Sequence, residues 1–282
     1  MVRVMESART WLAAACAALA GVARPLDRLD LERLTADVPR MESATAQLRH
    51  ATRASTALRR CAPDHRLVER RRVALAYLAV RARFPEELAL VAEASFRAAE
   101  LWRICGDLDT AAAELEVVRR LPCESEFRER ATLELAHLER RRERFERALD
   151  LYALVASDDD CEVRRRDEAA LWLGKTHALA GRADEAARWL RRLAHAAAHP
   201  LDRIRAYDEW AVLYVDEGDV EAAAGVLHAC RTALAEPARE ATRLGDGVRD
   251  ALAHMRCIAL LERAIARRRK GLVLHGDGDD DE

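Results

Sequence analysis

The sequence predicts an all-α protein, built as an α-solenoid of tandem antiparallel helical hairpins. Two observations carry this prediction, the composition and a repeated apolar spacing. Of the 282 residues, 50% are hydrophobic but only 5% are aromatic, and 58 are alanine. Alanine, leucine, arginine and glutamate favour helices, whereas the β-branched residues that favour strands are scarce. This composition excludes an all-β fold and argues against alternating strands and helices.

Four segments share an apolar spacing of 3, 1, 3 and 3 residues, which places the apolar residues on one face of a helix. The segments begin 37, 38 and 37 residues apart. Their apolar residues are Leu108, Ala111, Ala112, Leu115 and Val118; Phe145, Ala148, Leu149, Tyr152 and Val155; Ala183, Ala186, Ala187, Leu190 and Leu193; and Val220, Ala223, Ala224, Leu227 and Cys230. One hairpin cannot bury such a stripe by itself, so we expect neighbouring hairpins to stack on it.

Another helical stretch precedes each apolar stripe, and a short turn joins the two. The preceding stretches are 87–104, 125–142, 163–180 and 201–217. Glycine suits turns such as those at Gly181 and Gly218, because helices often end in a left-handed residue. Asp184 and Asp219 are expected to cap the helix that follows. The turn at 142–144 lacks glycine, so we expect it to be less sharply defined.

Two of these repeats also follow an order of large, small, aromatic, glycine, alanine, large and proline residues. The matching residues are Leu171-Trp172-Leu173-Gly174, His177, Gly181, Ala186, Leu190 and Pro200, then Trp210-Ala211, Tyr214, Gly218, Ala223, Leu227 and Pro237. These residues resemble the tetratricopeptide repeat (TPR) family, whose usual repeat has about 34 residues. The resemblance implies four repeats, at 86–122, 123–160, 161–200 and 201–237. A helical repeat of another family is the alternative.

The flanking residues are expected to continue the same stack. Residues 1–85 are predicted to form helices in degenerate hairpins that are continuous with the solenoid. Residues 238–271 predict one or two capping helices, with a break at Gly245-Asp246-Gly247. Residues 272–282 predict a disordered acidic tail, because they combine charge with glycine. The chain is therefore expected to form one continuous solenoid rather than independent domains.

The spacing of the cysteines and the lack of a long apolar run predict a cytoplasmic protein. The seven cysteines are widely spaced and include no CxxC motif, which is typical of reduced thiols. No run of 18 apolar residues is long enough to predict a transmembrane helix. The alanine-rich N-terminus predicts an amphipathic helix, because Trp11, Ala15 and Leu19 share one face. A signal peptide at residues 1–23 is the alternative.

The sequence predicts no enzyme, no cofactor and no metal site. Asp158-Asp159-Asp160-Cys161-Glu162 matches the magnesium-binding DDxxE pattern of class I terpene synthases. Those enzymes need a second metal motif, which we do not find, so the cluster predicts a loop between repeats. His195 and His199 have a metal-binding spacing but lack the glutamate of an HExxH motif.

The predicted function is protein recognition by a non-enzymatic scaffold or adaptor. The resemblance implies a concave groove lined by the first helix of each hairpin. The candidate partner-binding residues are Arg97, Arg103, Arg130, His137, Arg140, Arg141, Trp172 and Lys175. The first half of this groove is net basic, which predicts an acidic protein or peptide partner. The last predicted repeat, in contrast, is net acidic, with Arg205, Asp208, Glu209 and Asp216 on the same face of its first helix. Trp172 is the candidate anchor, because large aromatic residues dominate interface energetics.

Two other functions remain as alternatives. An RNA-binding helical repeat is the first alternative, although the net charge is -2 and no stacking aromatics interleave with the arginine triplets. An all-helical magnesium-dependent enzyme is the second. The acidic tail could also occupy the basic half of the groove.

Overall fold

The computed structural model describes residues 26, 28–123 and 126–276. These residues include no strand, and the chain divides into two compact units, Met1–Arg142 (unit 1) and Glu143–Glu282 (unit 2). The all-α prediction of stacked hairpins is confirmed in each unit, and the continuity of the stack from one unit to the next stays a prediction. The N-terminal prediction for residues 1–23 and the tail residues 277–282 lie outside the described residues.

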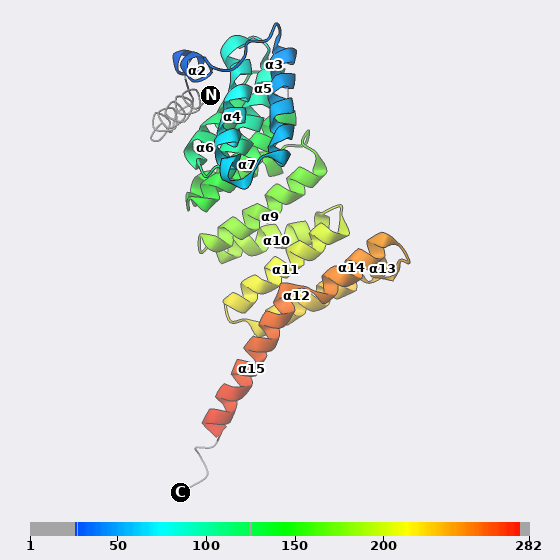
Figure 1. Ribbon diagram of the computed structural model, residues 1–282. Coiled ribbons are helices and arrows are strands. Elements are labelled where there is room, and N and C mark those ends of the chain that lie inside the picture. Colours follow the sequence, from blue (N-terminus) through cyan, green and yellow to red (C-terminus); the bar gives the residue numbers. More distant parts are fainter. Residues whose placement is uncertain (1–25, 27, 124–125, 277–282) are drawn as a thin grey trace. The chain divides into compact units, whose positions relative to one another are not determined.

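Unit 1 is a two-layer stack of helices (Figure 1). Its described helices are α2 (Arg28–Leu34), α3 (Ala44–Ala57), α4 (Arg66–Arg83), α5 (Leu88–Ile104), α6 (Leu108–Arg120) and α7 (Glu126–Arg141). Consecutive helices from α3 to α7 pack together, and α5 also contacts both α3 and α7. Helices α3, α5 and α7 therefore form one layer, which we call the A-layer, and α4 and α6 lie in the other.

Unit 2 repeats this arrangement and closes with additional helices (Figure 1). Its described helices are α8 (Phe145–Ala156), α9 (Val163–Leu179), α10 (Ala183–Ala196), α11 (Pro200–Asp216), α12 (Val220–Ala233), α13 (Ala235–Arg239), α14 (Arg243–Ala253) and α15 (Arg256–Gly276). Helices α9 and α11 contact each other and form the corresponding layer of unit 2, which we call the A-layer of that unit. Both α14 and α15 pack on α11. Helix α15 includes residues 272–276, which were expected to belong to the disordered tail.

The apolar stripes begin where their helices begin, and each preceding turn contains a left-handed residue. Helices α6, α8, α10 and α12 start at Leu108, Phe145, Ala183 and Val220. The φ angles are 82° at Gly106, 73° at Gly181 and 81° at Gly218. Glu143 has a φ angle of 60° at the corresponding place. The turn without glycine therefore adopts the same left-handed conformation, and the expectation that it would be poorly defined was wrong.

The helix caps agree with the sequence in one of the two predicted places. The Asp219 carboxylate accepts a hydrogen bond from the Ala222 backbone N–H at 2.9 Å and caps α12. Asp184 instead lies inside the first turn of α10. Its negative charge there interacts favourably with the positive end of the helix dipole. Asp107 caps α6, which was not predicted, and its carboxylate accepts a hydrogen bond from the Thr110 N–H at 3.1 Å.

Paired helices approach closely at small residues, as the repeat pattern predicted. Ala186, Ala211 and Ala223 are completely buried. A Cβ atom added to Gly174 would lie 2.6 Å from Cγ of Leu190, which is closer than van der Waals contact. These positions therefore have no room for a larger side chain.

The predicted helix break at Gly245-Asp246-Gly247 was wrong. These residues lie inside α14, and the Thr242 hydroxyl accepts a hydrogen bond from the Gly245 N–H at 3.1 Å to cap it. A Cβ atom at Gly245 would collide with the carbonyl oxygen of Glu240. Glycine is needed here because another part of the backbone is close, and not because the chain turns.

A buried ion pair links α4 and α6, the two helices of the second layer of unit 1. The Arg81 guanidinium donates to both carboxylate oxygens of Glu114, at 2.7 and 2.9 Å. Glu114 is fully buried, and Arg81 also lies 3.5 Å from the hydroxyl of Ser95. Separating the two helices would leave an uncompensated buried charge, so the ion pair holds α4 and α6 together. The contact of Arg81 with Ser95 adds α5 to this group.

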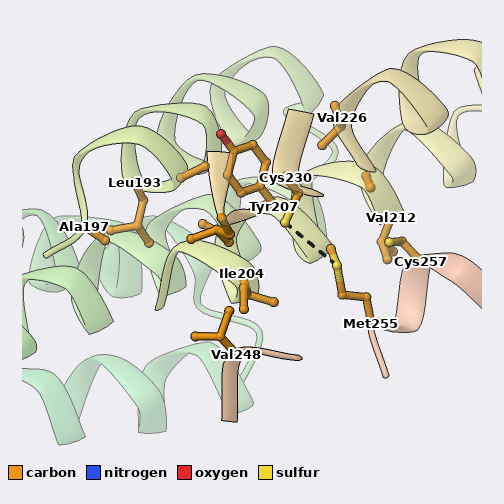
Figure 2. Packing of buried hydrophobic residues seen from close by; sticks show 14 residues of the cluster. Leu193, Ala197, Ile204, Tyr207, Val212, Val226, Cys230, Val248, Met255 and Cys257 are labelled. Atoms are coloured by element: carbon orange, nitrogen blue, oxygen red, sulfur yellow. Dashed lines mark hydrogen bonds between the residues drawn. The ribbon is translucent and has the colours of Figure 1, made fainter. Parts of the chain in front are cut away.

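The core of unit 2 contains two buried cysteines (Figure 2). Cys230 on α12 lies 3.9 Å from the sulfur of Met255, and Cys257 on α15 is also completely buried. Burial, together with the nearby Asp208 carboxylate, raises the pKa of both thiols to about 12. Both side chains therefore act as small apolar groups in this core.

The left-handed turns generate a first testable prediction. Gly181→Ala should lower the free energy of unfolding by about 1–2 kcal/mol, because an alanine is strained at positive φ. Glu143→Gly relieves the same strain, and the entropy cost of glycine, about 0.5–1 kcal/mol, only partly offsets that gain. Urea unfolding followed by circular dichroism should show opposite shifts. Stability that falls in both variants would contradict this reading of the turns.

The close helix crossings generate a second prediction. Ala223→Leu should overpack the crossing of α11 and α12 and lower the free energy of unfolding by about 1–3 kcal/mol. Ala224 is exposed and provides a matched control, because Ala224→Leu should change stability by no more than about 0.5 kcal/mol. Equal melting curves for the two variants would show that the assigned packing register is wrong.

The buried thiols generate a third prediction. At pH 8, iodoacetamide should label Cys61 and Cys123 of the folded protein much faster than Cys230 and Cys257. The first two are partly exposed, whereas the others are buried with a pKa of about 12 and so have almost no thiolate. Mass spectrometry of tryptic peptides measures the labelling of each residue. Rapid labelling of Cys230 without unfolding would contradict the packing in Figure 2.

Candidate functional site

The structure distributes the candidate partner-binding residues over the two units. Arg97 and Arg103 lie on α5, and Arg130, His137, Arg140 and Arg141 lie on α7, all in unit 1. Trp172 and Lys175 lie on α9 in unit 2. All of these helices belong to the A-layer of their unit. We therefore describe two surfaces, one in each unit.

The surface of unit 1, which we call the basic face, is formed by adjacent sides of α5 and α7. On α7, Arg130, Glu134, His137 and Arg141 are spaced i, i+4, i+7 and i+11, so they share one side of the helix. On α5, the neighbouring side carries Glu93, Arg97, Glu100 and Arg103. The opposite side of α7 is buried, for example at Leu135 and Leu138. The core packing thus fixes which residues face outward.

Arg130 is held in a defined orientation by two phenylalanines. Its guanidinium carbon lies 4.5 Å from the ring centre of Phe96 and 5.3 Å from that of Phe127. The two rings are 5.4 Å apart and are 1% and 7% exposed, so they form a fixed platform. No carboxylate of the described residues pairs with Arg130. Stacking uses the flat face of the guanidinium and leaves its N–H edge available for hydrogen bonds.

The other arginines on α5 already have carboxylate partners. Arg97 lies 3.3 Å from the carboxylate of Glu100 and 3.9 Å from that of Glu93. Arg103 on α5 lies 3.8 Å from Glu134 on α7. All of these side chains are about one-third exposed, so each pair contributes little, about 0–1 kcal/mol, and is screened by salt. An incoming carboxylate could therefore compete for these arginines.

The remaining candidates on α7 lie toward its C-terminal end. Arg141 is the last residue of α7, is exposed, and pairs with no carboxylate of the described residues. His137 and Arg140 are half-buried. Arg130 and Arg141 are therefore the two uncommitted cations of the basic face.

In unit 2, the candidate residues on α9 are engaged with the next helices. The Lys175 ammonium lies 4.9 Å from the ring centre of Trp172 and forms an ion pair with Glu209 on α11. Glu209 also accepts a hydrogen bond from Arg256 on α15 at 2.8 Å. The backbone N–H of Cys257 donates to Asp208 at 2.8 Å. Two of the acidic residues expected on this face, Asp208 and Glu209, therefore anchor α15, which covers part of α11.

Unit 2 has a pocket that the sequence did not predict. It has a volume of about 310 Å³ and is lined by Asp184, Ala187, Arg188 and Arg191 of α10 and by Trp210 and Tyr214 of α11. We call it the edge pocket. The spacing of its α10 residues, i, i+3, i+4 and i+7, marks a helix face beside the buried stripe. That spacing was the available signal, but the pairing of this face with Trp210 depends on tertiary packing.

The possible metal motifs have structural roles. The ring of His199 accepts a hydrogen bond from the Leu201 N–H at 3.3 Å and caps α11. Asp158 accepts a hydrogen bond from the Asp160 N–H at 3.0 Å, and Asp159 pairs with Arg166 at 3.0 Å. Within residues 26, 28–123 and 126–276, no group of three or more His, Cys, Asp or Glu side chains could hold a metal ion. No helix among those residues is long and apolar enough to cross a membrane.

Comparisons with known proteins find similarity in structure only. No protein-family model matches the sequence, and no curated protein matches it. A candidate kinesin light chain with nearly identical TPR-like repeats, from Podosopora anserina, is 18% identical with a TM-score of 0.55, over 71% of this chain and 100% of that one. A single-substitution variant of that protein is 17% identical, with the same coverage and TM-score. BtubC (BKLC) from P. vanneervenii is 16% identical, with a TM-score of 0.44, over 72% of this chain and 95% of that one.

The structural similarity agrees with the arrangement of the helices. Each unit stacks consecutive helices in two layers, and the turns at Gly106, Gly181 and Gly218 recur at the positions that the sequence pattern predicted. A TM-score of 0.55 at 18% identity supports the same fold. The chain is a helical-repeat protein with the tetratricopeptide-like fold.

Proposed function

We propose that the chain is a non-enzymatic scaffold or adaptor for protein–protein recognition, and that the basic face of unit 1 binds an acidic partner segment. The TPR-like fold suggests a protein-interaction scaffold in general, because stacked helices present an extended surface. The observation that carries the specific proposal is the guanidinium of Arg130, stacked on Phe96 and Phe127 without a carboxylate partner. The cysteine pattern supports a cytoplasmic setting.

The geometry of Arg130 suits a carboxylate ligand. A planar guanidinium donates two parallel N–H bonds to a carboxylate, and such charge-assisted bonds are stronger than neutral ones. Because the phenylalanine platform already restricts the side chain, binding costs less rotamer entropy than it would at a free arginine. Arg130 is therefore the proposed centre of the site.

Arg141 gives the expected length of the ligand. It lies eleven residues after Arg130 on the same side of α7, which corresponds to about 16 Å along the helix. An extended peptide spans that distance in about five residues, at roughly 3.3–3.6 Å each. The proposed ligand therefore carries acidic side chains about five residues apart. Arg97 and Arg103 lie on the adjacent helix α5, and an acidic ligand would compete for them with Glu93, Glu100 and Glu134.

The buried rings under Arg130 argue against the RNA-binding alternative at this face. Single-stranded nucleic acids bind through bases that stack on exposed aromatic rings. Phe96 is only 1% exposed and Phe127 only 7% exposed, so neither ring offers a free face to a base. A carboxylate, which needs only the edge of the guanidinium, fits the same surface better.

A charge-reversal experiment tests the proposed site. Arg130→Glu combined with Arg141→Glu should weaken binding of a fluorescein-labelled peptide with the sequence of residues 276–282, Gly-Asp-Gly-Asp-Asp-Asp-Glu, at least tenfold. Fluorescence anisotropy measures the dissociation constant. The affinity of the unmodified protein should also fall as ionic strength rises from about 0.01 M to 0.15 M, because the Debye length shortens from about 30 to about 8 Å.

A matched variant separates a local effect from a change in net charge. Arg59→Glu with Arg60→Glu alters the same net charge at exposed residues of the short 3₁₀ helix Leu58–Arg60. This control should bind the peptide as the unmodified protein does, and both variants should keep the unmodified circular dichroism spectrum. Equal losses in the two variants, or no loss in the first, would show that the basic face is not the site.

A further inference from the structure

The edge pocket of unit 2 has a defined apolar wall. Trp210 and Tyr214 are four residues apart on α11, and their ring centres are 6.2 Å apart. Trp210 also stacks on Tyr207 with a centre distance of 6.2 Å, and Tyr207 is completely buried. The hydroxyl of Tyr207 lies 3.4 Å from Nδ1 of His195 on α10. The wall is therefore supported from below by the core, and Ala187 opposite it leaves the space open.

The charges of the edge pocket are separated along α10. Asp184 lies in the first turn, and Arg188 and Arg191 follow four and seven residues later. Arg188 forms an ion pair with Glu185 at 3.0 Å. Arg191 is exposed and pairs with no carboxylate of the described residues. Seven residues of helix place Asp184 and Arg191 about 10 Å apart. One end of the pocket is thus acidic and the other is basic.

We propose that the edge pocket binds a three-residue stretch of an extended partner segment that carries a cationic, a large apolar and an acidic side chain in line. The first and third of three extended residues are about 7 Å apart along the backbone. The long side chains of a lysine in the ligand and of Arg191 in the pocket span the rest of the roughly 10 Å that separates Asp184 from Arg191 along α10. The cation pairs with Asp184, the apolar side chain packs between Ala187 and the rings of Trp210 and Tyr214, and the carboxylate pairs with Arg191 and Arg188. This inference rests on the proposed function as a protein-binding scaffold but uses a different unit and a different ligand charge.

The mixed charge decides between this ligand and a polyanion. A nucleic acid carries a negative charge at every phosphate, so its backbone would place one phosphate near Asp184. The same repulsion applies to a uniformly acidic peptide. A segment with opposite charges at its two ends satisfies both ends of the pocket.

Short peptides test the predicted ligand directly. The probes are Ac-Lys-Leu-Asp-NH2, Ac-Lys-Leu-Lys-NH2 and Ac-Asp-Leu-Asp-NH2, titrated into the full chain while NMR follows the tryptophan indole N–H signals. Trp210→Phe identifies the signal of Trp210. The first peptide should shift this signal with an affinity about fivefold higher than either of the others, since each of the others loses one exposed ion pair of up to about 1 kcal/mol.

Two pairs of variants localise the binding. Ala187→Phe fills the pocket and should weaken binding of Ac-Lys-Leu-Asp-NH2 at least tenfold, whereas Ala196→Phe, at an exposed position of the same helix, should not. Arg191→Glu should weaken it at least fivefold, and Arg192→Glu should leave it nearly unchanged. Arg192 is the adjacent exposed arginine, and it lies over Trp189 rather than in the pocket. Circular dichroism confirms that each variant is folded.

The outcomes separate this inference from the proposed function. Equal affinities for the three peptides, or an unchanged affinity in Ala187→Phe, would overturn the inference. A stronger response of Trp210 to Ac-Asp-Leu-Asp-NH2 or to a single-stranded oligouridylate would also overturn it and identify a polyanion site. Arg130→Glu with Arg141→Glu should leave Ac-Lys-Leu-Asp-NH2 binding intact, so failure at the basic face of unit 1 does not affect this test.

Discussion

The fold depends on how closely the two helices of each hairpin can approach. At Gly174 even a methyl group would collide with Leu190, and Ala186 is completely buried at the same crossing of α9 and α10. Ala223 is completely buried on α12, which pairs with α11. Close approach lets the apolar stripe of one hairpin pack on the next, since neither helix can bury that stripe alone. The left-handed residue of each turn then sets where the second helix begins. This constraint places the outward-facing residues of the A-layer helices, including Arg130.

The stack of unit 2 also needs a cover at its last repeat. Helix α15 supplies it, and Arg256 and Cys257 bind the carboxylates of Glu209 and Asp208 on α11. From the sequence, Glu209 and Asp208 are predicted to belong to a binding face, because their spacing places them on one side of α11. Spacing along a helix cannot show that a segment almost fifty residues later folds back on that side.

Local pattern explains what was predictable. The starts of α6, α8, α10 and α12 follow from spacing within each helix, and so do the buried alanines. Spacing also identified Arg130 and Arg141, but the ion pairs of Arg103 with Glu134 and of Lys175 with Glu209 join different helices. The buried Arg81–Glu114 pair, the division into two units and the edge pocket likewise arise from tertiary packing. The sequence therefore predicted the repeat, and which residues share one side of a helix, better than it predicted which charges are available to a ligand.

Photo-cross-linking tests the central claim that an acidic segment binds the basic face of unit 1. The probe is an extended acidic peptide with two aspartates five residues apart and a benzoylphenylalanine between them, and mass spectrometry maps the attachment sites on the full chain. We expect attachment to α5 and α7, near Phe96 and Arg130, and loss of attachment at high salt. Attachment concentrated on α10, α11 or α15 of unit 2, or spread evenly over both units, would contradict it.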